Sequence, residues 1–506
     1  MADENTAFPS SGEITPGSTL PAEETPPAAY PQEETQAVPP FPISTAVDTA
    51  AETVPPAEPS LAEIPPAEMP PPPSEEPSGP LELIKKILPP ALIALALLLV
   101  LFFGMKLIRR GGPVSKGGTL TYWGLWEPES VMTEVIAAYQ KDHPNVKITY
   151  VQQSPTDYRE RIQSAFSRGE GPDIFRLHNT WLPMFRNELA PLGADIISEK
   201  DYYPVVKKDL AVGNTFYGVP LMMDTLALYI NNEIFKAAGK TPPTTWEDLR
   251  KTALELTVKD RQGKIQQAGI ALGTTNNIDH WSDILGLMMY QNGVTLERPT
   301  GQNAEDALSF YSIFYAVDRV WDETLPPSTI SFAGGKVAMF FGPSWRVFDI
   351  KAINPGLDFQ VVAVPQLPGT NVTWASYWAE GIWNKSKNKE EATKFLKYLA
   401  QKEALQKLYQ AESSLRAFGE LYPRTEMAGL LAGNPLAAPF LAQATTARSW
   451  YVCSRTRDNG LNDRMIKYFE DAVNSINRGG NAREALATAS QGVSQLLTQY
   501  GIAATR

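Results

Sequence analysis

Residues that could perform chemistry are few in this sequence, and the common catalytic and metal-binding patterns are absent. The three histidines, His143, His178 and His280, lie far apart and the single cysteine, Cys453, has no partner, so no spacing suits a zinc site. The sequence also contains no nucleophile elbow, no HExxH motif and no complete phosphate-binding loop. We therefore expect no catalytic residue, no metal and no cofactor. Basic residues are scattered rather than gathered in a stripe, which argues against nucleic acid as a partner.

Aromatic and carboxylate side chains at the ends of predicted strands are the remaining candidates. Trp126 and Glu127 end the first predicted strand. Sugar rings offer apolar C–H faces and polar rims, so aromatic plates combined with carboxylates, amides or arginines suit a sugar. A carboxylate pair such as Glu127 and Asp224 could instead hydrolyse a glycosidic bond, a reaction that leaves little local sequence signature. A surface glycoside hydrolase therefore stays open as an alternative.

The elements that position these residues begin with a strand, a helix and a second strand. Residues 119–126 (TLTYWGLW) and 146–151 (VKITYV) are strand-like, and between them Val131, Val135 and Tyr139 share one helix face. This order is typical of an α/β protein with a parallel sheet.

The part of the chain from residue 119 onward has an ordinary globular composition and holds all 11 tryptophans. Its length favours two lobes over one core. Two later helices are marked by capping patterns, Asn388 with Glu391 and Asn481 with Glu484.

The first 80 residues differ from the rest in composition. They contain 20 of the 43 prolines and 14 acidic residues, but no lysine or arginine. Such a segment cannot bury enough apolar surface to offset the entropy of ordering, so residues 1–80 are predicted to be a disordered Pro/Glu-rich tail. The acidic balance of the whole chain describes this tail and not a ligand.

An apolar run of 19 residues, 87–105, follows the tail. As a helix it would span ~28 Å, close to the hydrocarbon thickness of a bilayer. No small-residue cleavage site and no cysteine for lipid attachment follows it, which disfavours a cleaved signal and a lipoprotein anchor. We predict a transmembrane helix with its flanks over 81–110, a flexible linker over 111–118 and a globular domain over 119–506.

The order of segments in the globular part resembles the family 1 extracellular solute-binding proteins of ATP-driven (ABC) importers, the group that includes maltose-binding proteins. The resemblance implies a two-lobed, periplasmic-binding-protein-like (type II) α/β fold with hinge strands near Met223, Asn371 and Tyr422. It is carried, in chain order, by the segments 122–151, RGEGPDIFRLHNTWL (168–182), 217–249, FAGGKVAMFFGPSW (332–345), VVAVPQLPG (361–369) and GIWNKSKNKEEATKFLKYL (381–399).

The same resemblance implies a ligand site in the cleft between the lobes. Asp173 of the GPD motif is expected to be a structural turn residue, and Trp246 and Trp383 are expected to be structural. The expected ligand-binding residues are Trp126, Glu127, His178, Asn179, Trp181, Asp224, Trp281, Trp345, Tyr377, Trp378 and Arg424.

The function implied by the resemblance is that of a non-enzymatic, membrane-tethered receptor. It would capture a carbohydrate or similar polyhydroxylated solute outside the cell by hinge closure and deliver it to ABC permease subunits. This places the tail in the cytoplasm and the domain outside, although a bare count of flanking positive charges favours the reverse orientation. Besides the glycoside hydrolase, a sensing or adhesion module without a transporter remains an alternative.

Overall fold

The computed structural model describes residues 118–502 of the chain. The predicted tail, the predicted transmembrane segment and nearly all of the predicted linker lie outside these residues. Between residues 118 and 502, none of the helices combines the length and the apolar character that crossing a bilayer requires.

A five-stranded sheet in the order β2-β1-β3-β13-β6 forms the centre of the first lobe. The strand β1 pairs in parallel with β2 and β3, whereas β13 runs antiparallel to β3 and β6. The predicted strand–helix–strand opening is thereby confirmed, with the first strand ending two residues earlier than expected. The bounds are β1 Thr119–Gly124, β2 Lys147–Gln152, β3 Ile174–His178, β6 Val219–Pro220 and β13 Trp378–Ile382.

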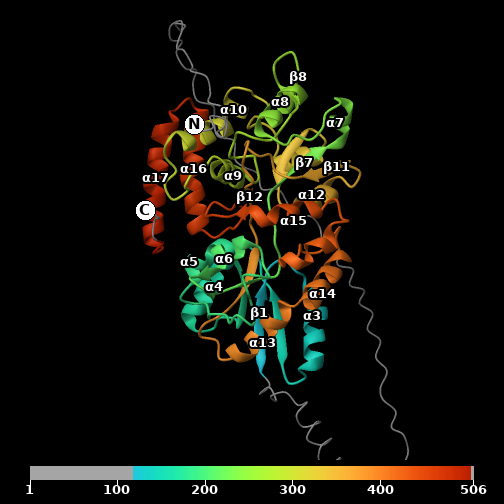
Figure 1. Cartoon of the computed structure of the whole chain (residues 1–506), viewed down its shortest axis with the longest axis vertical. Helices are drawn as coiled ribbons and strands as arrows, with labels where there is room; N and C mark the ends of the chain where they lie inside the picture. Colours follow the sequence, from blue (N-terminus) through green and yellow to red (C-terminus); the bar gives the residue numbers. More distant parts are fainter. Residues whose placement is uncertain (1–117, 503–506) are drawn as a thin grey trace, which may run out of the picture. The chain divides into compact units, whose positions relative to one another are not determined.

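Amphipathic helices cover this sheet (Figure 1). The face of α3 predicted from the sequence is buried, with Val131, Val135 and Tyr139 each at most 3% exposed. The helices of the first lobe are α3 Glu129–Asp142, α4 Tyr158–Arg168, α5 Leu182–Phe185, α6 Pro204–Leu210, α13 Lys389–Leu399 and α14 Lys402–Ser413.

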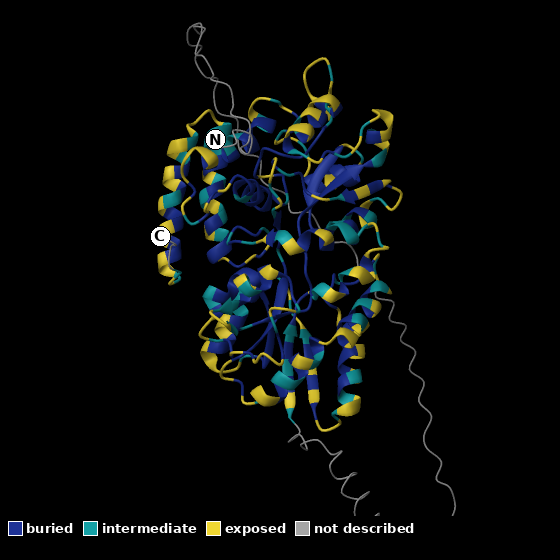
Figure 2. Cartoon of the chain, in the orientation of Figure 1, coloured by how far each residue is buried: buried dark blue, intermediate teal, exposed yellow. Residues whose placement is uncertain are grey.

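The second lobe has a three-stranded sheet, β10-β7-β11, in which both neighbours run antiparallel to β7. Its strands are β7 Ala227–Asn231, β10 Met339–Gly342 and β11 Phe359–Val362. The helices around it are α7 Asn232–Ala237, α8 Trp246–Leu256, α9 Trp281–Gln291, α10 Gln302–Ala316, α11 Ser328–Ala333, α12 Arg346–Ile353, α16 Leu461–Asn477 and α17 Ala482–Gln499. The helix α9 is buried along nearly its whole length, while α8, α16 and α17 expose their outer faces (Figure 2).

Three segments carry the chain between the lobes, and backbone hydrogen bonds join them. Met223 donates its N–H to the carbonyl of Leu421 at 2.9 Å, and Leu226 donates to the carbonyl of Trp374 at 2.9 Å. The segments 221–226, 373–377 and 421–424 are called the hinge segments below. They pass close to Met223, Asn371 and Tyr422, the positions implied by the resemblance.

Short elements brace the hinge segments. The strand β12 (Thr373–Trp374) pairs in parallel with β14 (Ala447–Arg448), and helix α15 (Ala438–Gln443) lies beside them. The remaining short elements are β4 Ala211–Val212, β5 Thr215–Phe216, β8 Val258–Lys259, β9 Ile265–Gln267, η1 Asn179–Trp181, η2 Thr425–Leu431 and η3 Ala444–Thr446.

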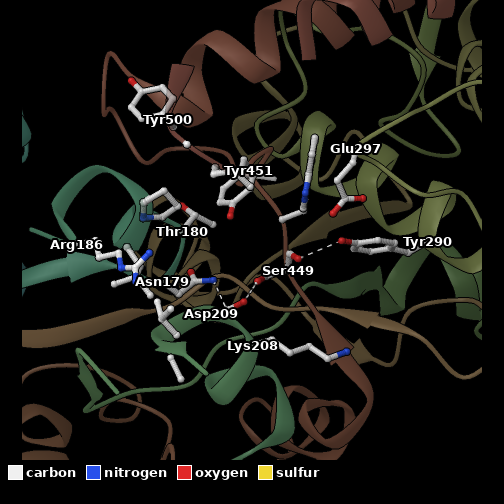
Figure 3. Close-up of a pocket in the computed structure, with 17 residues that line it drawn as sticks. Asn179, Thr180, Arg186, Lys208, Asp209, Tyr290, Glu297, Ser449, Tyr451 and Tyr500 are labelled. Carbon is white, nitrogen blue, oxygen red and sulfur yellow. Dashed lines mark hydrogen bonds between the residues drawn. The ribbon is translucent and has the colours of Figure 1, made fainter. Parts of the chain in front are cut away.

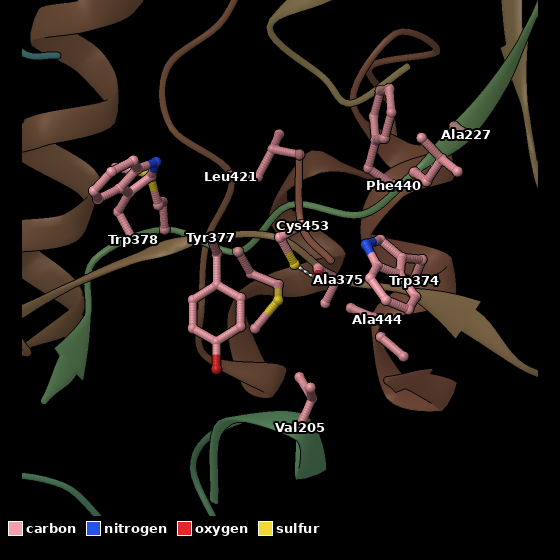
Figure 4. Close-up of a cluster of buried hydrophobic side chains, with 14 of the residues drawn as sticks. Val205, Ala227, Trp374, Ala375, Tyr377, Trp378, Leu421, Phe440, Ala444 and Cys453 are labelled. Carbon is pink, nitrogen blue, oxygen red and sulfur yellow. Dashed lines mark hydrogen bonds between the residues drawn. The ribbon is translucent and has the colours of Figure 1, made fainter. Parts of the chain in front are cut away.

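Apolar side chains from both lobes pack around the hinge segments (Figure 4). Trp374, Tyr377 and Leu421 are each about 1% exposed, and Cys453 is fully buried among them. The Cys453 thiol donates to the carbonyl of Ala375 at 3.7 Å, so the single cysteine packs against the hinge. The hinge segments therefore pass through a buried, largely apolar cluster.

The two predicted helix caps have different outcomes. Asn481 caps α17 as predicted, because its side chain accepts the N–H of Glu484 at 3.2 Å. The capping prediction at Asn388 is wrong: its amide donates to the carbonyl of Thr119 at 3.0 Å and makes no cap bond. A tertiary partner has taken the side chain away from the helix end. Asp173, which accepts the N–H of Thr121 at 2.8 Å, has the structural role expected of it.

Arg176 lies at the centre of the first lobe with 0% exposure and joins three elements. Its guanidinium donates to Glu127 in the loop after β1 at 2.6 Å and to Glu380 on β13 at 2.9 Å. Tyr122 on β1 also donates to Glu380, at 2.6 Å. Buried charges of this kind are tolerated only when they are paired.

We predict that Arg176→Met lowers the free energy of unfolding by about 3–5 kcal/mol, because it leaves Glu127 and Glu380 buried without their cation. Chemical denaturation of the chain measures this loss. Arg168→Met is the control, since the Arg168 side chain is 58% exposed in a surface pair with Glu170 and should change the stability by at most about 0.5 kcal/mol. Equal effects of the two substitutions would contradict the prediction.

Candidate functional site

Four aromatic side chains predicted to bind ligand gather at the end of the first-lobe sheet. The Trp378 ring is the centre of this group, with centroids 5.6 Å from Trp126, 5.0 Å from His178 and 5.2 Å from Trp181. Trp181 is fully buried, whereas Trp126 is 39% exposed. Within this group Trp126 therefore offers the accessible ring face, and Trp181 and Trp378 support it from below.

Glu127, next to Trp126, is engaged by internal partners. Both of its carboxylate oxygens accept from Arg176, and the side chain is 1% exposed. Its acceptor capacity is used inside the lobe, so Glu127 holds the Trp126 loop in place.

Asp224 lies in the first hinge segment and links the two sides of the hinge. Its carboxylate accepts the N–H of Ser344 at 3.1 Å and that of Thr225 at 2.8 Å, and its carbonyl accepts the N–H of Ser376 at 3.2 Å. Ser376 in turn lies 3.1 Å from Nε2 of His178. A continuous set of hydrogen bonds therefore runs from Ser344, the residue before Trp345, through Asp224 and Ser376 of the hinge to His178 in the first lobe.

Burial alters the protonation of these hinge groups. It is the largest influence on Asp224 and raises the pKa of that carboxyl to about 8, against the opposing effect of the Ser344 hydrogen bonds. Burial also lowers the pKa of His178 to about 3, so its imidazole is neutral at physiological pH.

A second group of residues lies on the second lobe, after β10 and before α9. Trp345 is half-buried, and its ring centroid is 5.8 Å from that of His280. Nε2 of His280 accepts from Arg346 at 2.9 Å, so the neutral ring carries its proton on Nδ1, which faces Asp283 at 3.3 Å. Trp281 begins α9 beside His280 and is 8% exposed.

Asn179, the first residue of η1, and Tyr377, the last residue of the second hinge segment, contact each other and share a partner. Both donate to Asp209 of α6, at 2.8 Å and 2.9 Å. Ser449 of the second lobe donates to the other carboxylate oxygen of Asp209. Burial is the main cause that raises the pKa of Asp209 to about 6.

A cavity of about 420 Å³ opens beside Asp209 and is lined by both lobes (Figure 3). Of the predicted ligand-binding residues, only Asn179 lines it. Aromatic side chains of Tyr290, Tyr451 and Tyr500 form much of its wall, with Asp209 and Ser449 at its base.

Arg424 is the predicted site residue that the structure does not bring to the others. Its guanidinium lies 5.6 Å from the ring of Tyr202 and pairs with Asp201 and Glu426. These contacts hold the third hinge segment against the first lobe.

Sequence reasoning missed Arg176, His280 and Arg346, which organise the two groups of aromatic residues. No local motif marks a buried arginine, because its carboxylate partners lie 49 and 204 residues away in the chain. Arg346 follows directly on the Gly-Pro-Ser-Trp turn, and its position could have suggested its role.

Comparison with known proteins places the chain in a family. The family model described as bacterial extracellular solute-binding protein matches residues 124–406, which is more than half of the chain.

Individual relatives are more distant. The chain is 26% identical to an uncharacterized lipoprotein of Streptomyces antibioticus over 61% of this chain and 71% of that protein. It is 24% identical to the multiple sugar-binding protein of Streptococcus mutans over 57% of this chain and 72% of that protein. The structure of the sugar-binding protein MalE from Xanthomonas citri matches with a TM-score of 0.62 at 21% identity, over 76% of this chain and 98% of that one. This likeness supports the two-lobed fold.

The raised pKa of Asp224 predicts a pH dependence of stability. The folded state holds the Asp224 proton up to about pH 8, whereas an unfolded aspartate releases it near pH 4. Stability should therefore fall as the pH rises between these values, by at most about 1.4 kcal/mol per pH unit. Asp224→Asn cannot ionise, so its unfolding free energy should fall less over the same range in urea melts at several pH values. Parallel curves for the two proteins would contradict the raised pKa.

Proposed function

The chain belongs to the bacterial extracellular solute-binding protein family, and we propose that it captures a carbohydrate-like solute between its two lobes. Several relatives support a sugar as the solute, among them the multiple sugar-binding protein of Streptococcus mutans and the maltotriose-binding protein of Pyrococcus abyssi. The exposed ring of Trp126 at the end of the first-lobe sheet is the observation that carries the proposal, because ligands of open α/β sheets bind at this edge.

Capture would proceed by rotation of the lobes about the hinge segments. A solute that stacks on Trp126 in the open form gains contacts to the Trp345 group only when the lobes approach each other. Those added contacts favour the closed form to the extent that the solute binds the closed form more tightly than the open form. The hydrogen bonds through Asp224 connect the Trp126 group and the Trp345 group to the hinge. They would keep the two groups aligned with each other during the rotation.

The proposed ligand contacts are a subset of the residues predicted from the sequence. Trp126, Trp345 and Trp281 supply aromatic surface. The other predicted residues, namely Glu127, His178, Asn179, Trp181, Asp224, Tyr377, Trp378 and Arg424, would act through the scaffold that positions these rings.

We further propose that the captured solute is delivered to the permease subunits of an ABC importer. The apolar run 87–105 would anchor the chain with a single membrane pass, the tail in the cytoplasm and the solute-binding domain outside. Tethering raises the effective concentration of the receptor at its permease without any new contact.

The glycoside hydrolase is the weaker alternative on the geometry of its two carboxylates. Glu127 and Asp224 are 1% and 7% exposed, and each is held by internal donors. Neither oxygen pair is presented to a glycosidic bond, which supports binding without a chemical step.

We predict that Trp126→Ala weakens sugar binding at least tenfold, because stacking on an aromatic plate contributes on the order of 1–3 kcal/mol. Titration calorimetry with maltodextrins and other oligosaccharides measures the loss. Trp126→Phe keeps an aromatic plate and should retain most of the affinity, and Leu430→Ala, at a leucine that is 57% exposed, is the surface control. Unchanged binding in Trp126→Ala would remove this ring from the site.

Deleting residues 81–110 should release the chain from the membrane fraction into the soluble fraction, since the apolar run that holds it would be gone. Immunoblots of fractionated cells measure the distribution. Protease added to intact cells tests the orientation: digestion of the domain with a protected tail is expected, and the reverse pattern would contradict the proposed topology.

A further inference from the structure

Asp279 and Asp283, two carboxylates beside the Trp345 group, are engaged by internal donors. The Asp279 side chain is 8% exposed; it accepts from Arg455 and Thr329 and forms an ion pair with Arg346. Asp283 is 3% exposed, and one of its oxygens accepts from Trp374 at 2.8 Å.

The other oxygen of Asp283 accepts from the hydroxyl of Ser454 and faces Nδ1 of His280. Asp224 and Glu127 are used in the same way, as described above. Asp279, Asp283, Asp224 and Glu127 are thus engaged by internal donors and offer a bound solute little acceptor capacity. Asp349, which follows Trp345 by four residues, is more exposed and pairs with Arg346.

Exposed arginines are present on the same part of the second lobe. In the segment 455–459 the residues alternate, with Arg455, Arg457 and Asn459 exposed and Thr456 and Asp458 buried. The three exposed residues all have left-handed backbone, with φ of 64°, 50° and 43°. This conformation is unfavourable for residues other than glycine and persists only where the surroundings impose it.

The buried residues of the segment impose the conformation. Asp458 is fully buried, and its carboxylate accepts the N–H groups of Gly460, Asn462 and Asp463 at 2.9–3.1 Å, which caps α16. Ser454 fixes the other end through its hydrogen bonds to Asp283. The side chains of Arg455 and Arg457 are thereby held outward.

The segment lies where the second lobe meets the first. At one end, Arg455 and Arg346 share the carboxylate of Asp279, beside the Trp345 group. At the other end, Asn462 of α16 donates to the hydroxyl of Thr180 in the first lobe at 2.7 Å. In the sequence Arg457 lies between these two contacts and is exposed, and no hydrogen bond or ion pair connects its guanidinium to another residue within 118–502.

We propose that the solute carries an anionic group, a carboxylate or a phosphate on a sugar, and that Arg457 binds this group with help from Arg455. The inference rests on the proposed function and adds the chemical class of the solute. Its basis is a contrast between the charges: Asp279, Asp283, Asp224 and Glu127 are engaged internally, while the Arg457 guanidinium, with its five donors, is exposed and has no hydrogen-bond or ion-pair partner among residues 118–502. Guanidinium groups match carboxylate and phosphate oxygens in a bidentate geometry.

The test compares acidic sugars with their neutral counterparts on the full chain. Calorimetric titrations would use glucuronate, glucose 6-phosphate, digalacturonate, glucose and maltose at low and moderate salt. At least one acidic sugar should bind ten or more times more tightly than its neutral counterpart, and its affinity should fall with salt. The two acidic arms distinguish a carboxylate from a phosphate.

The variant Arg457→Asn removes the guanidinium and suits the left-handed backbone, because asparagine tolerates this conformation. It should lose at least tenfold in affinity for the acidic sugar and keep its melting temperature. Arg319→Asn is the matched control: Arg319 is also exposed and left-handed, with φ of 51°, and follows α10 in the same lobe. The control variant should bind as the parent does.

The outcomes separate the two proposals. Neutral sugars binding as tightly as the acidic ones, or equal effects of Arg457→Asn and Arg319→Asn, would overturn the anionic solute. In that case binding of neutral sugars that is lost in Trp126→Ala would leave the proposed function standing. Absence of binding for every sugar would count against both.

Discussion

The buried guanidinium of Arg176 is the interaction on which the arrangement of the first lobe depends. It extends from the middle of β3 and pairs with Glu127 after β1 and with Glu380 on β13, so three neighbouring segments are joined at one point. The loop that presents Trp126 follows β1 directly and is held by the Glu127 end of this pair. A buried ion pair contributes little net stability compared with apolar packing, but it permits only one arrangement of its partners. The accessible ring is positioned by that restriction.

The same cluster of buried charged side chains extends to α14. Carboxylate oxygens of Glu127, Glu412 and Glu420 all lie within 4.8 Å of one another, and Arg416 pairs with the latter two. Burial raises the pKa of Glu412 well above its usual range. Two arginines, Arg176 and Arg416, neutralise this group of carboxylates from within the lobe, and the cluster joins α14 to the loop that carries Trp126.

Periodicity and segment order predicted the fold well, because they depend on local features. The β1–α3–β2 unit and the Asn481 cap each follow from residues a few positions apart, and the lobe crossings follow from family order. The site was predicted less completely. Trp126 and Trp345 stand at strand ends, where sequence could place them, but the partners that decide whether a carboxylate is available lie far away in the chain. The sequence predicted Glu127 and Asp224 as ligand contacts. The fold shows that Glu127 pairs with Arg176 and that Asp224 accepts from Ser344.

The hinge segments determine which surfaces a solute can use. His178 and Ser376 lie within hydrogen-bond distance of each other beside Trp378, whereas Asn179 and Tyr377 both donate to Asp209, which lines the cavity. Hydrogen bonds also join the lobes beside this cavity, where Ser449 bonds Asp209 and Asn462 bonds Thr180. A rotation of the lobes has to keep or replace these two bonds. A solute that drives the rotation must therefore supply at least the binding free energy that they contribute, which calls for strong contacts such as stacked rings and charged pairs.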